Sequence, residues 1–206
     1  MKRSTLIFLK TIVWIGCLVP FAELAWGAVN NSLGPDPTAE IANTTGLTAL
    51  WILAITLAIS PVRRLSPRLA WLIRFRRLIG LFVFFYATLH MLTWVALYSN
   101  FSLAAMLDDV TKRRFIMAGA ATYLLLLPLA ATSTNWAIGR MGGKNWSRLH
   151  MLIYPAAICA TIHYWWKVKT GVLSPAPFTL VLAVLLLARP VMAWAGRRRR
   201  ARAVAA

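Results

Sequence analysis

The sequence predicts an all-α membrane protein, a single bundle of six transmembrane helices with both termini on the cytoplasmic side. Hydrophobic residues make up 60% of the 206-residue chain, and the mean hydropathy is +0.66. That is more apolar sequence than one soluble core of this size can hide. The charged residues fall between the apolar segments. The net charge of +18 therefore does not indicate nucleic-acid binding, which would place the cations along one face or in a basic domain.

The first apolar segment covers residues 11–29 and follows three cations. A cleaved signal peptide ending near residues 25–28 is one interpretation of it. The apolar run is long, however, and contains Trp14, Glu23 and Trp26, so a retained membrane anchor is favoured.

The second segment covers residues 44–60 and is expected to stop at Pro61. A polar connection, residues 30–43, precedes it, and the Gly-Pro-Asp-Pro sequence at 34–37 is typical of a turn. Residues 63–77 follow with six arginines, which makes this stretch too charged to span a membrane.

Four further segments complete the bundle, at residues 78–98, 115–131, 149–166 and 178–195. The loop at 99–114 carries Asp108 and Asp109, and the loop at 133–147 is basic and contains glycine. The short loop after residue 166 is broken by glycine and proline, and the last segment runs into an arginine-rich tail.

The distribution of cations sets the expected orientation. With six spans, 18 of the 23 Lys and Arg residues lie on the side of the termini. The other side has Lys112, Arg113, Arg114, Lys167 and Lys169, together with four of the five acids. The positive-inside rule therefore places both termini in the cytoplasm. The sequence shows no internal repeat of the kind found in transporters.

All three histidines lie in apolar segments, where an ionisable residue indicates function. His163 follows His150 by thirteen residues, and His90 follows Arg77 by the same number, which in a helix is roughly 20 Å along the axis. Both segments run outward from the cytoplasm. His90 and His163 are therefore expected at one depth, toward the outer edge of the membrane.

Two neutral imidazoles from neighbouring helices at one depth can bind the iron of a non-covalent haem from both sides. Such a haem has no open position and transfers electrons. Zinc or copper would need further ligands, which these spans lack at that depth. The alternative is that the histidines pack or relay protons. Cys17 and Cys159 form no CxxC or CxxCH motif, which argues against a zinc site and a covalent c-type haem.

His150 lies at the inner edge, level with Arg77 and beside Arg148. It is a weaker candidate for haem binding, either as the one protein ligand of a second haem or as a structural residue. Arg76, Arg77 and Arg148 are candidates for binding haem propionates or a flavin phosphate where electrons enter. On an ideal helix His150 and His163 would point about 140° apart. Pro155, between them, can kink or rewind the helix.

Seven short sequences carry a family resemblance across essentially the whole chain: GPDP at 34–37, TGLTAL at 45–50, RRLIGL at 76–81, YATLH at 86–90, ATSTN at 131–135, WSRLH at 146–150 and IHYWWKVK at 162–169. Jointly they resemble the MsrQ (YedZ) family, the haem-binding membrane subunits of bacterial protein-methionine-sulfoxide reductase systems. That family belongs with the ferric-reductase-like transmembrane domains shared with NADPH oxidases.

The resemblance implies a haem b on His90 and His163, with His150 also important as a candidate ligand of a second haem. It implies FMN, and electrons from a cytoplasmic flavin reductase or from quinone in the bacterial inner membrane. The implied acceptor is a periplasmic molybdopterin enzyme that reduces methionine sulfoxide in oxidised envelope proteins. The NADPH-oxidase pattern has two histidines on the third span, whereas this chain has only His90 there, with Arg77 at the inner position.

No dinucleotide-binding motif follows a strand in this sequence, and residues 139–143 are a glycine-containing loop. An outside electron donor is therefore expected. The cytoplasmic arginines offer a surface for an acidic partner, a flavin phosphate or anionic lipid. Two other functions fit the same residues: a stand-alone ferric or oxygen reductase, and a non-redox transport or assembly protein.

Overall fold

The computed structural model describes residues 2–168 and 174–205, which contain helices and no strand. Lys169, one of the predicted outer cations, lies outside the described residues. The elements in chain order are α1 (Arg3–Val29), α2 (Pro37–Leu65), η1 (Pro67–Arg74), α3 (Arg76–Thr93), η2 (Trp94–Tyr98), α4 (Leu103–Lys112), α5 (Arg114–Ala131), α6 (Asn135–Met141), α7 (Gly143–Leu149), η3 (His150–Leu152), α8 (Ile153–Lys167) and α9 (Ala176–Ala205).

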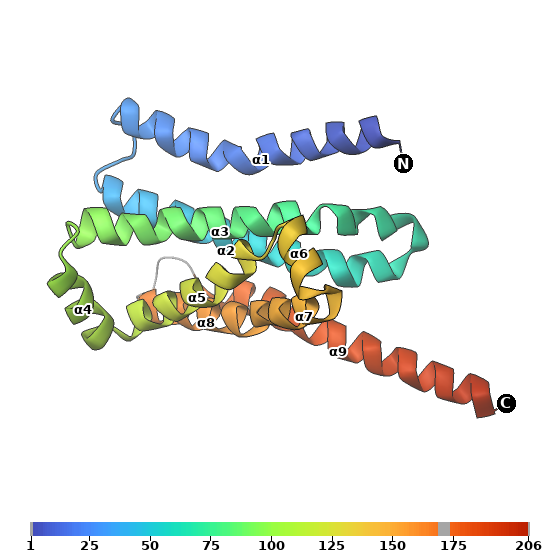
Figure 1. The fold of residues 1–206 in the computed structure, drawn as a ribbon. Helices are drawn as coiled ribbons and strands as arrows, with labels where there is room; N and C mark the ends of the chain where they lie inside the picture. Colours follow the sequence, from blue (N-terminus) through green and yellow to red (C-terminus); the bar gives the residue numbers. More distant parts are fainter. Residues whose placement is uncertain (1, 169–173, 206) are drawn as a thin grey trace.

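The long helices α1, α2, α3, α5, α8 and α9 run side by side in alternating directions (Figure 1). The two termini lie at the same end of the bundle, together with η1, α6 and α7, and we call this the inner end. The short helix α4 lies at the opposite end, which we call the outer end.

Among the described residues, four helices are long and apolar enough to cross a membrane: α1, α2, α3 continued through η2, and α5. The all-helical class is therefore confirmed, while the count of six spans and the cytoplasmic termini stay predictions. The fifth predicted span is divided, because α8 has only 15 residues and follows the 3₁₀ turn η3. The apolar part of α9 covers Ala176–Ala188. A helix needs about 20 residues to cross the hydrocarbon core without tilting or thinning it.

Helix α2 is longer than the predicted span at both ends. The carboxylate of Asp36 accepts a hydrogen bond from the Ala39 N–H (2.9 Å), and Pro37 begins the helix, as is favourable at a first turn. The sequence at 34–37 is therefore a helix cap. Helix α2 also continues through Pro61 to Leu65, so Pro61 does not end it as expected.

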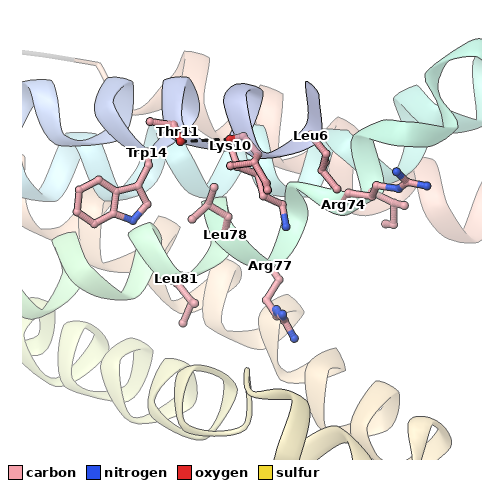
Figure 2. Close-up of a pocket in the computed structure, with 10 residues that line it drawn as sticks. Leu6, Lys10, Thr11, Trp14, Arg74, Arg77, Leu78 and Leu81 are labelled. Atoms are coloured by element: carbon pink, nitrogen blue, oxygen red, sulfur yellow. Dashed lines mark hydrogen bonds between the residues drawn. The ribbon is translucent and has the colours of Figure 1, made fainter. Parts of the chain in front are cut away.

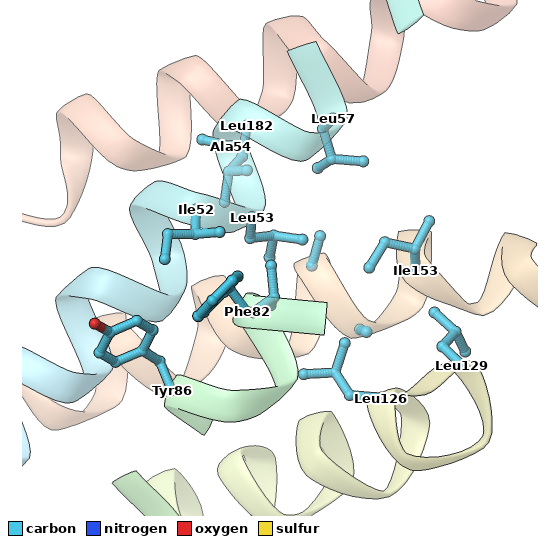
Figure 3. Close-up of a cluster of buried hydrophobic side chains, with 13 residues drawn as sticks. Ile52, Leu53, Ala54, Leu57, Phe82, Tyr86, Leu126, Leu129, Ile153 and Leu182 are labelled. Carbon is cyan, nitrogen blue, oxygen red and sulfur yellow. The ribbon is translucent and has the colours of Figure 1, made fainter. Parts of the chain in front are cut away.

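The core lies between α2, α3, α5, α8 and α9 (Figure 3). Leu53 and Leu57 of α2 are almost fully buried, as is Leu182 of α9. On α8, Ala156 and Ala157 are fully buried. Because these side chains are small, they let neighbouring helices approach closely, which is how membrane helices commonly associate.

Tyr86 attaches α1 to this core. Its hydroxyl donates to the Cys17 carbonyl (2.6 Å) and accepts from the Phe21 N–H (3.1 Å). In a regular α-helix the Phe21 N–H would donate directly to the Cys17 carbonyl. Pro20 lies between these two residues. Insertion of a side chain into this ladder is a known cause of helix bending. Through Tyr86, the otherwise exposed α1 is connected to α3.

Candidate functional site

The structure brings His90 of α3 and His163 of α8 into ring contact. Their ring centroids are 5.8 Å apart, and their planes are nearly perpendicular at 82°. The ring of Phe115, at the start of α5, lies 6.1 Å from that of His163. The two histidines thus lie at one depth, toward the outer end of the bundle.

His90 is oriented by the backbone of α2. Its Nδ1 lies 2.9 Å from the Ala42 carbonyl oxygen. Because a carbonyl can only accept, Nδ1 must carry the proton, which leaves the lone pair on Nε2. Thr45 lies beside it at 3.5 Å, but its hydroxyl donates to the Ile41 carbonyl (2.6 Å). The neutral ring therefore presents Nε2 as its ligand atom.

His163 is oriented in the same way by α5. Its Nδ1 lies 2.6 Å from the Phe115 carbonyl oxygen, so the same tautomer follows. In both cases the carbonyl precedes the histidine by 48 residues. The helix pairs α2–α3 and α5–α8 therefore repeat one arrangement, although the sequence shows no visible repeat. Backbone carbonyls of this kind fix the ring orientation of metal-binding histidines and raise their basicity.

A glycine packs against each imidazole, and sequence reasoning missed both. A Cβ at Gly46 would lie 3.1 Å from the Nδ1 and Cε1 of His90. A Cβ at Gly119 would lie 2.8 Å from the Nδ1 of His163. Each glycine comes four residues after the anchoring carbonyl, one helical turn along. Lone glycines inside apolar helices were the only sign of them in the sequence.

The two free nitrogens, Nε2 of His90 and Nε2 of His163, suit a metal that is bound from two opposite sides. With metal–nitrogen bonds of about 2.0 Å, two imidazoles on opposite sides of one atom hold their ring centres roughly 6 Å apart. The observed separation is close to that. In the described part of the chain, no group of three or more His, Cys, Asp or Glu side chains gathers to bind a metal. Two nitrogen ligands alone match the axial positions of a haem iron rather than a zinc site.

His150 lies in a different environment, on the 3₁₀ turn η3 at the inner end. Its ring stacks on Trp146, with centroids 3.9 Å apart. Its Nε2 lies 3.3 Å from the Thr132 hydroxyl, which donates to the Pro128 carbonyl (2.6 Å). That hydroxyl can then only accept, so Nε2 of His150 carries the proton. This is the opposite tautomer to that of the outer pair.

Pro155 accounts for the break between His150 and His163. It is the third residue of α8 and has no N–H to donate to Met151, one turn earlier. The residues before it wind as η3 instead of continuing an α-helix. His150 and His163 therefore do not share one regular helix, and the angle of about 140° expected for such a helix does not apply.

The three candidate arginines lie in different surroundings. Arg77 donates from Nη1 to the Asn135 amide oxygen (2.6 Å), which connects α3 to the start of α6. Arg76 lies within electrostatic range of His150. Arg148 is exposed on α7. The structure thus brings Arg76 near His150 and gives Arg77 a different partner.

Lys167, at the end of α8, is the cation beside the outer pair. Its ammonium donates to the Asn43 side-chain oxygen on α2. It lies within electrostatic range of both His90 and His163. The outer site therefore combines two neutral imidazoles with one exposed positive charge.

Comparison with known proteins gives a consistent result. Residues 66–161 match the family model described as "Ferric reductase like transmembrane component". A protein from Herminiimonas arsenicoxydans named "Protein-methionine-sulfoxide reductase heme-binding subunit MsrQ" is 44% identical over 93% of this chain and 88% of its own length. Two proteins of the same name, from Xanthomonas oryzae pv. oryzae (strain MAFF 311018) and Ralstonia nicotianae, are 44% and 40% identical over 98% and 92% of this chain. These two matches extend over 94% and 88% of the relatives' own lengths.

No solved structure matches the chain. The apolar helices and the transmembrane family model together indicate a multi-pass membrane protein. Identity of this level over nearly the full length of both proteins confirms the family that the seven short sequences suggested. The chain belongs to the MsrQ family, with a ferric-reductase-like transmembrane domain.

Proposed function

We propose that this protein is a membrane electron-transfer subunit that binds a b-type haem between His90 and His163. The observation that carries the proposal is the matched anchoring of the two imidazoles. Each has Nδ1 hydrogen-bonded to a carbonyl of a neighbouring helix, which leaves Nε2 as the ligand atom. The names of the relatives, which describe heme-binding subunits, support this assignment.

When bound, such a haem supplies a one-electron redox centre. The protein's own residues determine its properties. His90 and His163 would both hold the haem iron, which would leave no position on it for substrate. The carbonyls of Ala42 and Phe115 keep both rings in one tautomer and one orientation. Lys167 is placed to favour the reduced state, because a nearby positive charge stabilises an added electron.

The partners follow from the family and from the lack of a nucleotide-binding motif. Electrons would come from a cytoplasmic flavin reductase or from quinone, and pass to a periplasmic molybdopterin enzyme of the inner-membrane system. Reduction of one methionine sulfoxide to methionine takes two electrons and two protons and releases water, so a one-electron carrier must act twice per sulfoxide. That bond chemistry belongs to the partner.

The inner end is the proposed place where electrons arrive. It offers one imidazole, His150, with Arg76 nearby and Arg148 exposed. Guanidinium groups bind phosphate well, so this end could hold the phosphate of an FMN. In this tautomer His150 would offer Nδ1 to a second haem, and it would offer Nε2 only after that nitrogen left the Thr132 hydroxyl.

The test is the dithionite-reduced minus oxidised visible spectrum of the purified protein, with haem quantified as the pyridine haemochrome. Wild type should show a low-spin b-type spectrum. His90→Ala and His163→Ala should each abolish it, whereas His150→Ala should retain it. Yield and helix content, measured by circular dichroism, show whether each variant is folded.

Two results would contradict the proposal. A folded wild-type protein without haem, produced with ample haem supply, would leave the histidines as packing or proton-relay groups. Rapid reduction of ferric chelates by the purified protein without a partner would favour a stand-alone ferric reductase, since it requires a substrate site beside the haem.

A further inference from the structure

A groove of about 650 Å³ lies at the inner end, between α1 and the η1–α3 region, away from the histidine pair (Figure 2). One wall is α1, which contributes Lys10 and Trp14. The other is formed by η1 and the first turns of α3, including Arg74, Arg77 and Leu78. The complete lining is Leu6, Ile7, Lys10, Thr11, Trp14, Ile73, Arg74, Arg77, Leu78 and Leu81.

Three cations line this groove, and no acidic side chain does. Figure 2 shows Lys10 reaching from α1 toward the start of α3, where Arg77 lies, with Arg74 at the same end. One N–H group of Arg77 donates to Asn135. The guanidinium has further N–H donors that can bind an anion. Three positive charges along one groove without an acid favour an anion there.

The rest of the lining is apolar. Apart from the cations, Thr11 is the one hydroxyl-bearing residue there, and its hydroxyl already donates to the Ile7 carbonyl (3.2 Å). A flavin ring would need both donors and acceptors along its edges, and apart from the cations and Thr11 these walls offer only the Trp14 indole N–H, which is a donor. Leu78, Leu81 and Trp14 instead provide a surface that suits a hydrocarbon chain.

The position of the groove favours a ligand from the bilayer. Most residues of α1 are exposed: Gly27 is buried, and Cys17 and Leu18 are half-buried against the core, so the rest of the helix surface is largely open to lipid. The cations of the groove lie toward the arginine-rich inner end, and Trp14 and Leu81 lie farther along the helices, so a phosphate head would meet the cations while its acyl chain follows the helices. Basic pockets between membrane helices commonly bind anionic lipid head groups.

We propose that this groove is a specific site for one anionic phospholipid, with its phosphate held by Lys10, Arg74 and Arg77 and an acyl chain packed between α1 and α3. The lipid adds to the packing of α1 against α3, which otherwise depends on Tyr86 and on the ring contacts Trp14–Phe82 and Phe21–Phe85. This assignment does not depend on the haem proposal.

The experiment is native mass spectrometry of the detergent-purified protein titrated with phosphatidylglycerol, phosphatidylcholine or FMN. Wild type should retain one phosphatidylglycerol more tightly than phosphatidylcholine. Lys10→Gln with Arg74→Gln should weaken that binding roughly thirtyfold, at about fivefold per cation. The matched control, Lys2→Gln with Arg68→Gln, removes two exposed cations from the same region of the chain outside the groove and should bind as wild type does.

A charge-preserving swap, Lys10→Arg with Arg74→Lys, should keep phosphatidylglycerol bound even if the neutral variant folds poorly. The proposal is overturned if the neutral variant and the control bind phosphatidylglycerol equally. It is also overturned if phosphatidylcholine binds as tightly, or if FMN binds in a way that depends on Lys10 and Arg74. Haem content, measured on the same samples, should be unchanged in the neutral variant. A wild-type protein without haem would contradict the proposed function but not the lipid site.

Discussion

The two ends of the bundle use the same helices differently. At the outer end, α3 and α8 supply His90 and His163, each anchored through Nδ1 to a carbonyl. Thirteen residues earlier along the chain the corresponding positions are Arg77 and His150. Arg77 is bonded to Asn135, and His150 is bonded through Nε2 to Thr132. The comparison shows that the hydrogen bond on one ring nitrogen decides which nitrogen is free: Nε2 in His90 and His163, and Nδ1 in His150.

The largest expected effect comes from filling the space beside the outer rings. In Gly119→Ala the new Cβ would lie 2.8 Å from His163 Nδ1, so the ring must leave the Phe115 carbonyl. We expect most of the haem to be lost, measured as haem per protein. Gly46→Ala, with its closest approach at 3.1 Å, should have the same effect to a lesser degree.

The control for these substitutions is Gly80→Ala, whose Cβ would lie 3.7 Å from Thr56, an ordinary contact. Its haem content should match that of wild type. Equal haem content in Gly119→Ala, Gly46→Ala and Gly80→Ala would mean that the close packing against the imidazoles has no role in binding.

The second prediction concerns the inner histidine. His150→Phe keeps an aromatic ring to stack on Trp146 but removes the bond to Thr132. We expect unfolding to become easier by about 1 kcal/mol, with the outer haem spectrum unchanged. Thermal unfolding and the visible spectrum measure the two effects. Loss of the low-spin spectrum in His150→Phe would mean that the inner histidine is also needed for binding of the outer haem.

The third prediction tests whether Arg77 acts as a structural connection. A double-mutant cycle of Arg77→Ala and Asn135→Ala should give a coupling free energy on the order of 1 kcal/mol, because the hydrogen bond joins α3 to α6. Chemical or thermal unfolding of wild type and of the single and double variants provides the four values. Strict additivity would show that this bond does not stabilise the inner end.

The smallest expected effect is on the redox potential. Lys167→Gln removes the positive charge near the outer pair and should lower the midpoint potential, by only on the order of ten millivolts because the side chain is exposed. Arg148→Gln removes an exposed cation at the inner end and serves as the control, with no shift expected. A rise in potential on removing Lys167 would contradict its proposed electrostatic role.

Much of the architecture could be predicted from the sequence. Apolar runs and the positions of arginines locate the helices, and the spacing of His90 and His163 from Arg77 and His150 predicts which histidines meet. Pro155 indicated that the fifth span can be kinked or rewound, but the 3₁₀ turn η3 itself could not be predicted, because a proline permits several local conformations and tertiary packing selects one. The extension of α2 through Pro61 could not be predicted either, since a membrane helix can end at a proline or continue through it.

The anchoring of the histidines could not be predicted either. It depends on carbonyls of Ala42 and Phe115, and every residue has a carbonyl, so no residue type indicates it. Gly46 and Gly119 matter only because the helices cross closely at those turns. The shared separation of 48 residues can be recognised only once both contacts are seen in space.

The most direct test of the central claim is the electron paramagnetic resonance spectrum of the oxidised protein at low temperature. Two axial imidazoles make ferric haem low-spin, and nearly perpendicular ring planes, such as the 82° between His90 and His163, give a strongly anisotropic signal. We predict that signal in wild type and in His150→Ala, and its loss in His90→Ala and in His163→Ala. A high-spin signal in wild type, or a low-spin signal that survives in either outer variant, would contradict ligation by His90 and His163.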